Sequence, residues 1–149
     1  MSLQIANVCD EIAGLSVTGV TIRDIDEIKE ELGGRDTPYL MPKPDGFITD
    51  FSVERDSFGA AANARKTATY TLNYTYLHAP LGSGRGLFDV YDGMVKNSFA
   101  ILDAIIAKDS TIAVDLVPSD ALAYGPVVDP AGNAYHGCII SVYVTEFVN

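Results

Sequence analysis

Two histidines and two cysteines are the residues of this chain best suited to catalysis, and His136 and Cys138 stand two positions apart. Side chains two apart on a strand share a face, so a thiol and a histidine base could meet there. No third group is evident to orient the base, and a cysteine inside an apolar strand is typically unreactive. His78 has no second ligand at a metal spacing. We therefore expect histidines with structural roles and no catalytic cysteine.

A glycine-rich loop, Gly82–Gly86 (GSGRG), precedes a long helical segment. Backbone amides at such a junction are able to hold a phosphate. The spacing matches neither the P-loop nor the dinucleotide fingerprint, and no Lys-Ser or Lys-Thr pair follows. We expect a plain loop. A small-ligand or phosphate-binding domain that uses this loop and Arg85 remains the alternative from a different functional class.

Acidic residues cluster between positions 24 and 31 without the ligand spacing or the central glycine of a calcium loop. We interpret this cluster as a solvated face. The sequence thus predicts no metal, no cofactor and no catalytic residue, and the protein is not expected to be an enzyme. The clustered residues are Asp24, Asp26, Glu27, Glu30 and Glu31.

Composition and net charge argue against two further classes of function, nucleic-acid binding and membrane binding. The 149 residues are 48% hydrophobic, which suits a single domain over 1–149 that folds without disulfide or metal. Ten Lys and Arg stand against twenty Asp and Glu, so the net charge is −10. Such a surface repels phosphate backbones and anionic lipids. We expect neither specific nucleic-acid binding nor membrane binding, and no apolar run reaches the ~18 residues of a membrane span.

Apolar residues at helical spacing predict two helices. The first is short and carries Ile5, Val8, Ile12 and Leu15 on one face. The second covers Leu87–Lys108 and has an apolar stripe formed by Phe88, Tyr91, Val95, Phe99, Leu102 and Ile106. Further apolar positions widen this stripe: Val90, Met94, Ile101 and Ile105. The extra width indicates a second burial surface, or else cover from the first helix.

Alternating patterns predict four strands, over 47–55, 66–78, 111–117 and 135–148. In the first, Phe47, Thr49, Phe51 and Val53 are expected to share one face. The first two strands should form a hairpin with a long tip over 56–65. Residues 19–32 suggest a short strand and a helical turn. We expect an α+β fold: a mainly antiparallel four-stranded sheet with the long helix and the short N-terminal helix packed on one face.

The proline-rich segment Thr37–Gly46 (TPYLMPKPDG) is apolar but irregular. It either lies across the fold or docks on a neighbour. Aromatic residues are also expected on the surface at the hairpin tip and on the outer face of the last strand. Exposed aromatics are common anchors of protein contacts. The predicted assembly interface comprises Pro38, Tyr39, Leu40, Met41, Pro42, Phe58, Tyr143 and Phe147.

The layout resembles the small tail proteins of long-tailed bacteriophages, the tail terminator and the related minor tail or tail-completion proteins. The resemblance rests on a short N-terminal helix, the segment Gly19–Ile28 (GVTIRDIDEI) and the stretch Thr37–Pro44 (TPYLMPKP). A long hairpin, one long helix and two closing strands complete it. The resemblance covers nearly the whole chain and is one of element order.

This resemblance implies a non-enzymatic ring, expected to hold six copies, that caps the head-proximal end of the tail tube. The implied partners are other copies of the chain, the tail tube protein and the head–tail connector protein. The implied location is the virion tail, after assembly in the bacterial host cytoplasm. A closed ring needs two different matching patches on each copy, for which the proline-rich segment and the 56–65 tip are the candidates. A head–tail connector or completion protein remains the alternative within this class.

Overall fold

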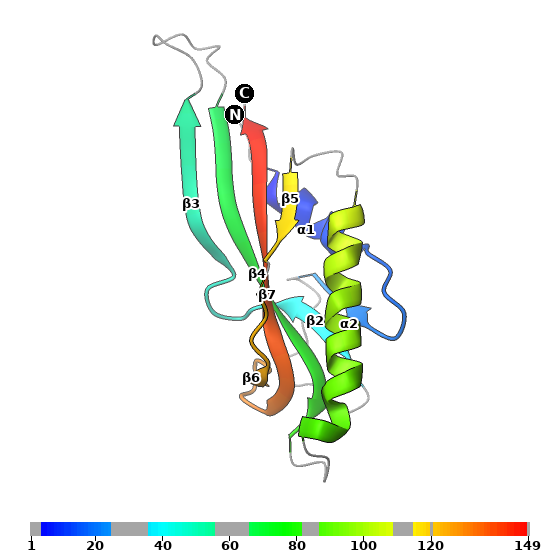
Figure 1. Cartoon of the computed structure of the whole chain (residues 1–149). Coiled ribbons are helices and arrows are strands. Elements are labelled where there is room, and N and C mark those ends of the chain that lie inside the picture. Colours follow the sequence, from blue (N-terminus) through cyan, green and yellow to red (C-terminus); the bar gives the residue numbers. More distant parts are fainter. Residues whose placement is uncertain are drawn as a thin grey trace.

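A computed structural model describes residues 4–24, 36–55, 66–81, 87–108, 115–119 and 121–148. Figure 1 shows two helices packed against a long, strongly twisted sheet. The elements in chain order are α1 (Ile5–Ala13), β1 (Thr21–Ile22), β2 (Tyr39–Pro42), β3 (Ile48–Arg55), β4 (Lys66–Pro80), α2 (Leu87–Ala107), β5 (Asp115–Pro118), β6 (Gly125–Val128) and β7 (Ala134–Val148).

The centre of the sheet is an antiparallel ribbon of β4 and β7, each 15 residues long. It pairs from Lys66 with Val148 at one end to Pro80 with Tyr135 at the other. Threonine, tyrosine and β-branched residues suit this pleated arrangement, and alternate residues turn to opposite faces. One face of the ribbon is buried as expected, and it holds Ala68, Tyr70, Leu72, Tyr74, Tyr76, Cys138, Ile140, Val142 and Val144.

Shorter strands flank both sides of this ribbon. β3 and β2 pair with successive parts of β4, while β5 and β6 pair with successive parts of β7. Asn73 lies where β3 gives way to β2, and its side chain donates to the Gly46 and Phe47 carbonyls and to Thr49 Oγ1. β1 joins β2 in parallel. The sheet is therefore seven-stranded and mixed.

The predicted fold class is wrong. The helices and the hairpin of β3 and β4 occur as expected, but the sheet is not a mainly four-stranded antiparallel one, and strand content predominates. The two missed strands, β2 and β6, contain Pro42 and Pro126. Proline argued against strands in the sequence because it lacks a ladder donor. Backbone pairing nevertheless holds both segments in the sheet: β2 pairs with the distant strand β4, and β6 forms a hairpin with β7.

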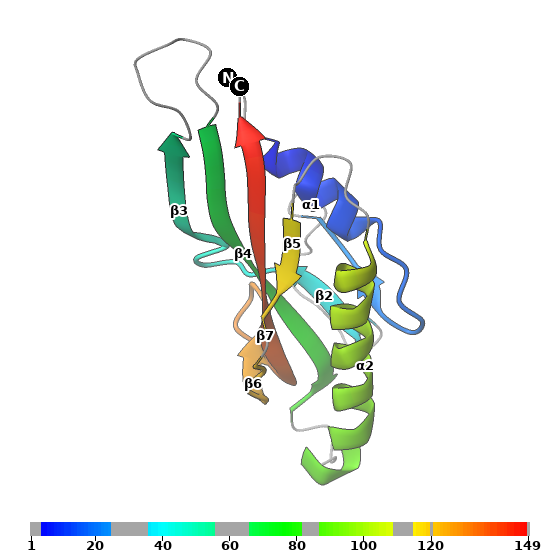
Figure 2. The ribbon, with the colours of Figure 1, turned by 45° about the horizontal axis from the view of Figure 1, so that its top comes forward.

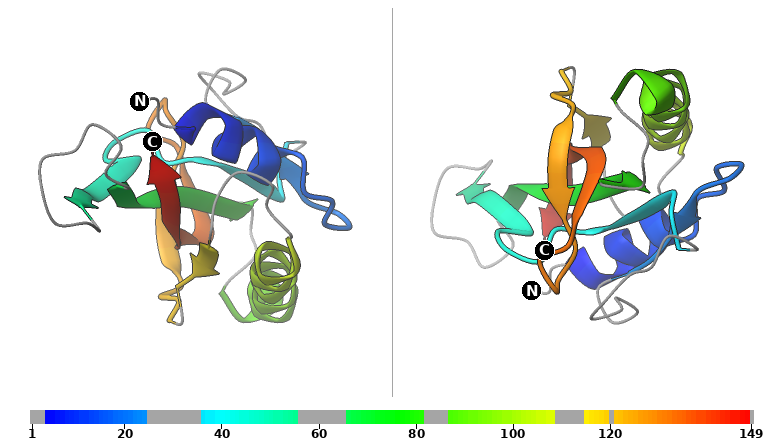
Figure 3. Two further views of the ribbon diagram at one scale, coloured as in Figure 1. Left: turned by 90° about the horizontal axis from the view of Figure 1, so that it is seen from above. Right: turned by 90° about the horizontal axis from the view of Figure 1, so that it is seen from below.

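Both helices contribute to one core on the buried face of the ribbon. Val8 and Ile12 of α1 join Met94, Ile101 and Ile105 of α2 in the same hydrophobic cluster. Figure 2 shows α1 beside one half of the ribbon and α2 along the other half. Figure 3 shows how strongly the strands twist between the two ends of the molecule. The twist lets one sheet wrap around both helices.

A buried carboxylate joins the start of α1 to β7. Glu146 has no exposed surface, and its Oε1 accepts a hydrogen bond of 2.9 Å from the backbone N–H of Gln4. Its Oε2 accepts one of 2.6 Å from the Tyr70 hydroxyl. Burial, followed by this hydrogen bond, raises the pKa of Tyr70. Glu146 thus caps a helix whose own N-cap side chain makes no capping bond.

The alternation predicted for residues 47–55 is interrupted by a β-bulge. The register of β3 shifts between Thr49 and Ser52, where Asp50 has a φ of 55°. One extra residue in a strand reverses the facing of those that follow. Ile48 pairs with Leu72 and Val53 with Ala68, both on the core-facing side of the sheet. The expectation that Thr49 and Val53 share a face is therefore wrong.

Candidate assembly surface

Helix α2 fills the core with one face and presents apolar side chains to solvent with another. Val90, Met94, Ile101 and Ile105 are at most 1% exposed. Ser98 lies among them, and its hydroxyl donates to the Val95 carbonyl and bonds the Tyr124 hydroxyl at 2.6 Å. The positions that widened the predicted stripe are thus the residues that enter the core.

The outward face of α2 carries residues of the predicted stripe itself. Tyr91 is 45% exposed, Phe99 56% and Ile106 65%. These three side chains stay largely exposed, whereas Met94, Ile101 and Ile105, which widen the stripe, are buried in one cluster with Val8 and Ile12 of α1. Large apolar side chains gathered on one exposed face are typical of contact surfaces.

This face borders a hollow that we call the α2–β5 groove. It is lined by Phe99, Leu102, Asp103 and Ile106 of α2 and by Val117, Pro118 and Ser119. Its volume is about 320 Å³. β5 ends the strand order on this side of the sheet, and Figure 1 shows it beside the C-terminal half of α2. The groove therefore lies at a sheet edge.

The groove contains one acidic side chain. Asp103 is exposed on its helical wall. Lys108 directly follows the last residue of α2, where the helix carbonyl groups carry partial negative charge. The lining of the groove is otherwise mainly apolar.

A second apolar surface lies at the opposite edge of the sheet, on β3. Phe51 is 47% exposed and stacks on Tyr70 with ring centres 5.9 Å apart, while Val53 is 42% exposed. Arg55 pairs with Lys66 in backbone register at the end of this strand pair. We call Phe51 and Val53 the β3 strip.

The proline-rich part of the predicted interface is buried within the chain. Leu40 belongs to the main core, whereas Tyr39 and Met41 join a second cluster with Leu77 and Tyr135 on the other side of the sheet. Pro42 is buried as well, and Pro38 is half-buried. The segment lies across the fold, so the expectation that its side chains anchor a partner is corrected. The sequence did not distinguish a buried strand from a partner-binding segment, because apolar residues suit both.

The remaining predicted anchors have different outcomes. Tyr143 is 50% exposed and Phe147 41% exposed, which confirms their place on the outer face of β7. Tyr143 pairs with Val117, so it continues the apolar surface from β5 onto β7. Phe58 and the rest of the 56–65 tip lie outside the described residues. The assembly role of these aromatics remains a prediction.

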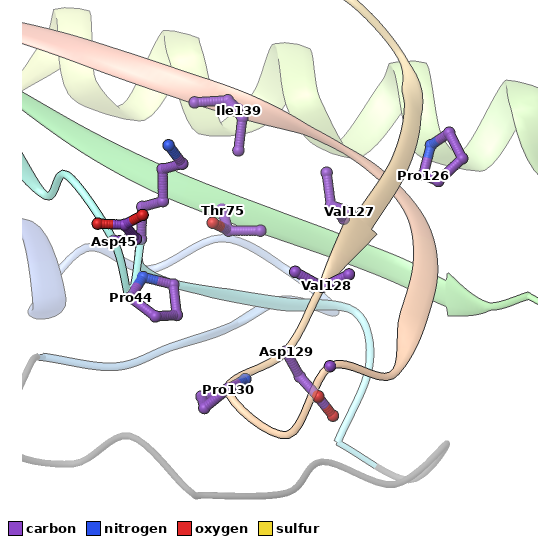
Figure 4. A pocket seen from close by; sticks show the side chains of 11 residues that line it. Pro44, Asp45, Thr75, Pro126, Val127, Val128, Asp129, Pro130 and Ile139 are labelled. Atoms are coloured by element: carbon purple, nitrogen blue, oxygen red, sulfur yellow. The ribbon is translucent and has the colours of Figure 1, made fainter.

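A separate hollow of about 470 Å³ lies near the other end of the sheet. Figure 4 shows Thr75 and Ile139 on its strand wall, Pro44 and Asp45 on one side, and Val127 and Val128 on the other. The buried Asp129 carboxylate accepts bonds from the Asn133 backbone and side chain and from the Tyr135 hydroxyl. Asp129 therefore stabilises the turn into β7.

The thiols are in surroundings that oppose nucleophilic chemistry. Burial raises the pKa of Cys138 to about 12. Burial, with a smaller contribution from Asp24, raises that of Cys9 to about 11 despite a hydrogen bond with Tyr74. Both thiols are therefore protonated near neutral pH, and a thiol attacks far more slowly than a thiolate. His136 is also buried, and its Nε2 has no hydrogen-bond partner among the described residues.

The second histidine belongs to a small polar network under α2. His78 Nδ1 lies 2.6 Å from the Tyr76 hydroxyl, which also accepts a 3.0 Å bond from Asn97 Nδ2. The network ties β4 to the helix. In the described part of the chain, no three His, Cys, Asp or Glu side chains gather as metal ligands. The Gly82–Gly86 loop with Arg85, and most of the acidic cluster, lie outside the described residues.

No protein-family model matches the chain, and no curated protein is significantly similar to it. None of the described helices is long and apolar enough to cross a bilayer. The case for a function therefore rests on the surfaces described above.

Proposed function

We propose that this protein is a structural component of a phage or prophage tail that assembles with copies of itself. In this proposal it forms a ring, expected to hold six copies, that caps the tail tube and joins it to the head connector. It acts in the virion tail after assembly in the bacterial host cytoplasm, and it performs no catalysis. One observation carries the proposal: α2 exposes Phe99 and Ile106 beside the sheet edge formed by β5.

The physical argument is that exposed apolar area is costly unless something covers it. Phe99 and Ile106 are more than half exposed on a helix whose opposite face already supplies the core. Covering such side chains contributes roughly 25 cal/mol per Å² of apolar surface removed from water. Assembly into a larger particle provides that cover. The surroundings of the thiols support a role without chemistry, since burial keeps them protonated.

The negative charge is compatible with this role. A chain of net charge −10 that lines or flanks a DNA channel repels the phosphate backbone and does not retain passing DNA. The same charge opposes self-association at long range. Assembly therefore depends on apolar contacts at short range, which the α2–β5 groove offers.

The decisive experiment mixes the purified protein with tail tubes that lack their terminator and, separately, with head connectors. Electron microscopy then scores capped tube ends and occupied connectors. We expect capped tubes with wild-type protein and at least a tenfold loss of capping with Phe99→Ser. Asp45→Ser, on the hollow of Figure 4, is the matched control and should cap normally.

Binding to connectors without capping of tubes would favour the connector or completion alternative over the terminator. Absence of binding to either component, together with absence of rings at high concentration, would exclude a tail-assembly role.

A further inference from the structure

We infer that the free edges of the described sheet are protected against strand addition, so that copies of this chain do not join by continuing one another's sheet. Contacts between copies must then be made by side chains, as at the α2–β5 groove. The inference goes beyond the proposed function, because it limits how the chain associates in any particle. It concerns the strands at the ends of the described pairings: β1, β3, β5 and β6.

β3 is the edge strand that most needs protection. It has eight residues, whereas β1 has two, and β5 and β6 have four each. Ile48 is 43% exposed, and Phe51 and Val53 of the β3 strip are exposed as well. No other described strand pairs with its outer side (Figure 1). A long edge strand with exposed apolar side chains is a template for pairing with an extended segment of another molecule.

A β-bulge interrupts this template in the first half of β3. The register with β4 shifts between Thr49 and Ser52, where two residues, Asp50 and Phe51, stand opposite one. Asp50 is exposed and has a φ of 55°, in the left-handed region that few residues other than glycine adopt. A bulge bends its strand and increases the local twist, so a regular partner strand does not follow the edge past it.

Side-chain hydrogen bonds hold the bulge on both sides. Before it, Thr49 Oγ1 accepts a bond of 2.9 Å from Asn73 Nδ2. After it, the hydroxyls of Ser52 and Thr69 lie 2.8 Å apart and bond each other. These two bonds fix the offset between β3 and β4. The bulge is therefore a built feature of the edge, and an incoming strand does not straighten it without breaking them.

A proline occupies an outward position on β5. The Ser119 N–H donates to the Ser141 carbonyl, so the backbone of Ser119 points toward β7. Along an antiparallel strand, successive residues turn their backbone groups alternately toward and away from the partner. Pro118 therefore turns its nitrogen away from β7, where it supplies no N–H to a further strand. Leu116 carries the other outward N–H of β5.

β6 repeats this arrangement at the other end of β7. The Asp129 N–H donates to the Asn133 carbonyl, so Val128 and Pro126, one and three positions earlier, turn their backbone outward. Pro126 lacks an N–H, which leaves the outward donor of Val128. Each four-residue edge thus offers one outward N–H at most. Short edge strands with an outward proline do not support a ladder with another chain.

Deletion of Asp50 tests the bulge, because it removes the extra residue and leaves the register pairs on either side unchanged. We expect open-ended polymers, with at least ten times the wild-type share of protein mass at equal concentration, by analytical ultracentrifugation. Hydrogen exchange of the β3 amides should be slower in these polymers, which locates the new pairing. Asp50→Gly, which suits a positive φ and keeps the bulge without the charge, is the matched control and should associate like wild type.

Replacement of the prolines tests the short edges without a change of register. Pro118→Val and Pro126→Val each add an outward N–H, and the double variant should raise the polymer share at least threefold. Pro44→Val, at an exposed position outside the strands, is the control and should have no effect. This variant pair decides the matter if urea denaturation shows that the deletion variant does not fold.

Three results would overturn the inference: wild-type association of the folded deletion variant, wild-type association of the double proline variant, or polymers of Asp50→Gly. Polymers whose β3 amides exchange as fast as in the monomer would also count against it, because the pairing would then lie elsewhere. Backbone pairing of β3 between copies in a wild-type ring, seen by electron microscopy, would overturn it and leave the proposed function in place. Absence of rings and capped tubes would overturn the proposed function alone.

Discussion

Two apolar segments exchange the roles that their sequences suggest. Tyr39–Pro42 belongs to the proline-rich segment, which is predicted to be irregular and is included in the predicted assembly interface; it is a fully buried strand with clusters on both sides. The regular apolar stripe of α2, which has the pattern of a buried helix face, is more than half exposed at Phe99 and Ile106. Regularity of pattern therefore does not decide burial. What decides it is whether long-range pairing places other elements around the segment.

The largest contrast should come from alanine substitutions in these two segments. Leu40→Ala leaves a cavity in the main core and should lower the free energy of unfolding by about 2–5 kcal/mol. Phe99→Ala removes a half-exposed ring and should change it by no more than about 0.5 kcal/mol. Urea denaturation of the two variants measures both values. Equal losses would mean that the contrast in burial is wrong.

The next contrast compares two glycines that face each other across β6 and β7. Gly137 approaches β4 so closely that an added Cβ would lie 1.8 Å from the Tyr76 carbonyl oxygen, whereas nothing lies within 4 Å at Gly125. Gly137→Ala should cost about 1–3 kcal/mol or more, because the strands must move apart. Gly125→Ala is the control and should unfold at the same urea concentration as wild type.

A third comparison sets the buried Glu146, which caps α1, against an exposed glutamate of β3. Glu146→Gln replaces an acceptor oxygen with an amide donor between the Gln4 N–H and the Tyr70 hydroxyl, so one donor loses its partner. We expect a loss of about 1–3 kcal/mol in unfolding free energy. Glu54→Gln, on the exposed part of β3, should be neutral. A neutral Glu146→Gln would show that the cap does not stabilise the fold.

Alkaline pH should produce the most gradual effect. The pKa of Cys138 rises from 9.0 in the unfolded chain to about 12 on burial, so its contribution is complete below pH 9 and is lost between pH 9 and about 12. The loss is at most about 1.4 kcal/mol per pH unit for this thiol. Cys138→Ala should show a shallower decline of melting temperature above pH 9. Rapid labelling of the native thiol at pH 8 would contradict the burial.

Sequence reasoning correctly predicted which residues of the two long strands are buried, because alternation of side chains marked one face of each strand. The tyrosines of residues 66–78 and the aliphatic residues of 138–144 alternate, and the two strands pair with these residues on the buried face. It missed the seven-stranded sheet because Pro42 and Pro126 argued against strands, and because β2 pairs with residues of β4 that are about 32 to 38 positions away. It correctly placed Tyr143 and Phe147 on the outer face of β7. It could not tell which of the two apolar faces of α2 is buried.

The sequence by itself determined the two helices, the long strands and the alternation within them, because backbone geometry fixes side-chain direction within a few residues. Only the tertiary structure decided which apolar face of α2 enters the core, that Tyr39–Pro42 is a strand, and that a bulge at Asp50 turns Val53 to the core-facing side. Each of these depends on contacts between distant segments. Local patterns specify which faces exist, and the packing of the whole chain selects the face that remains exposed.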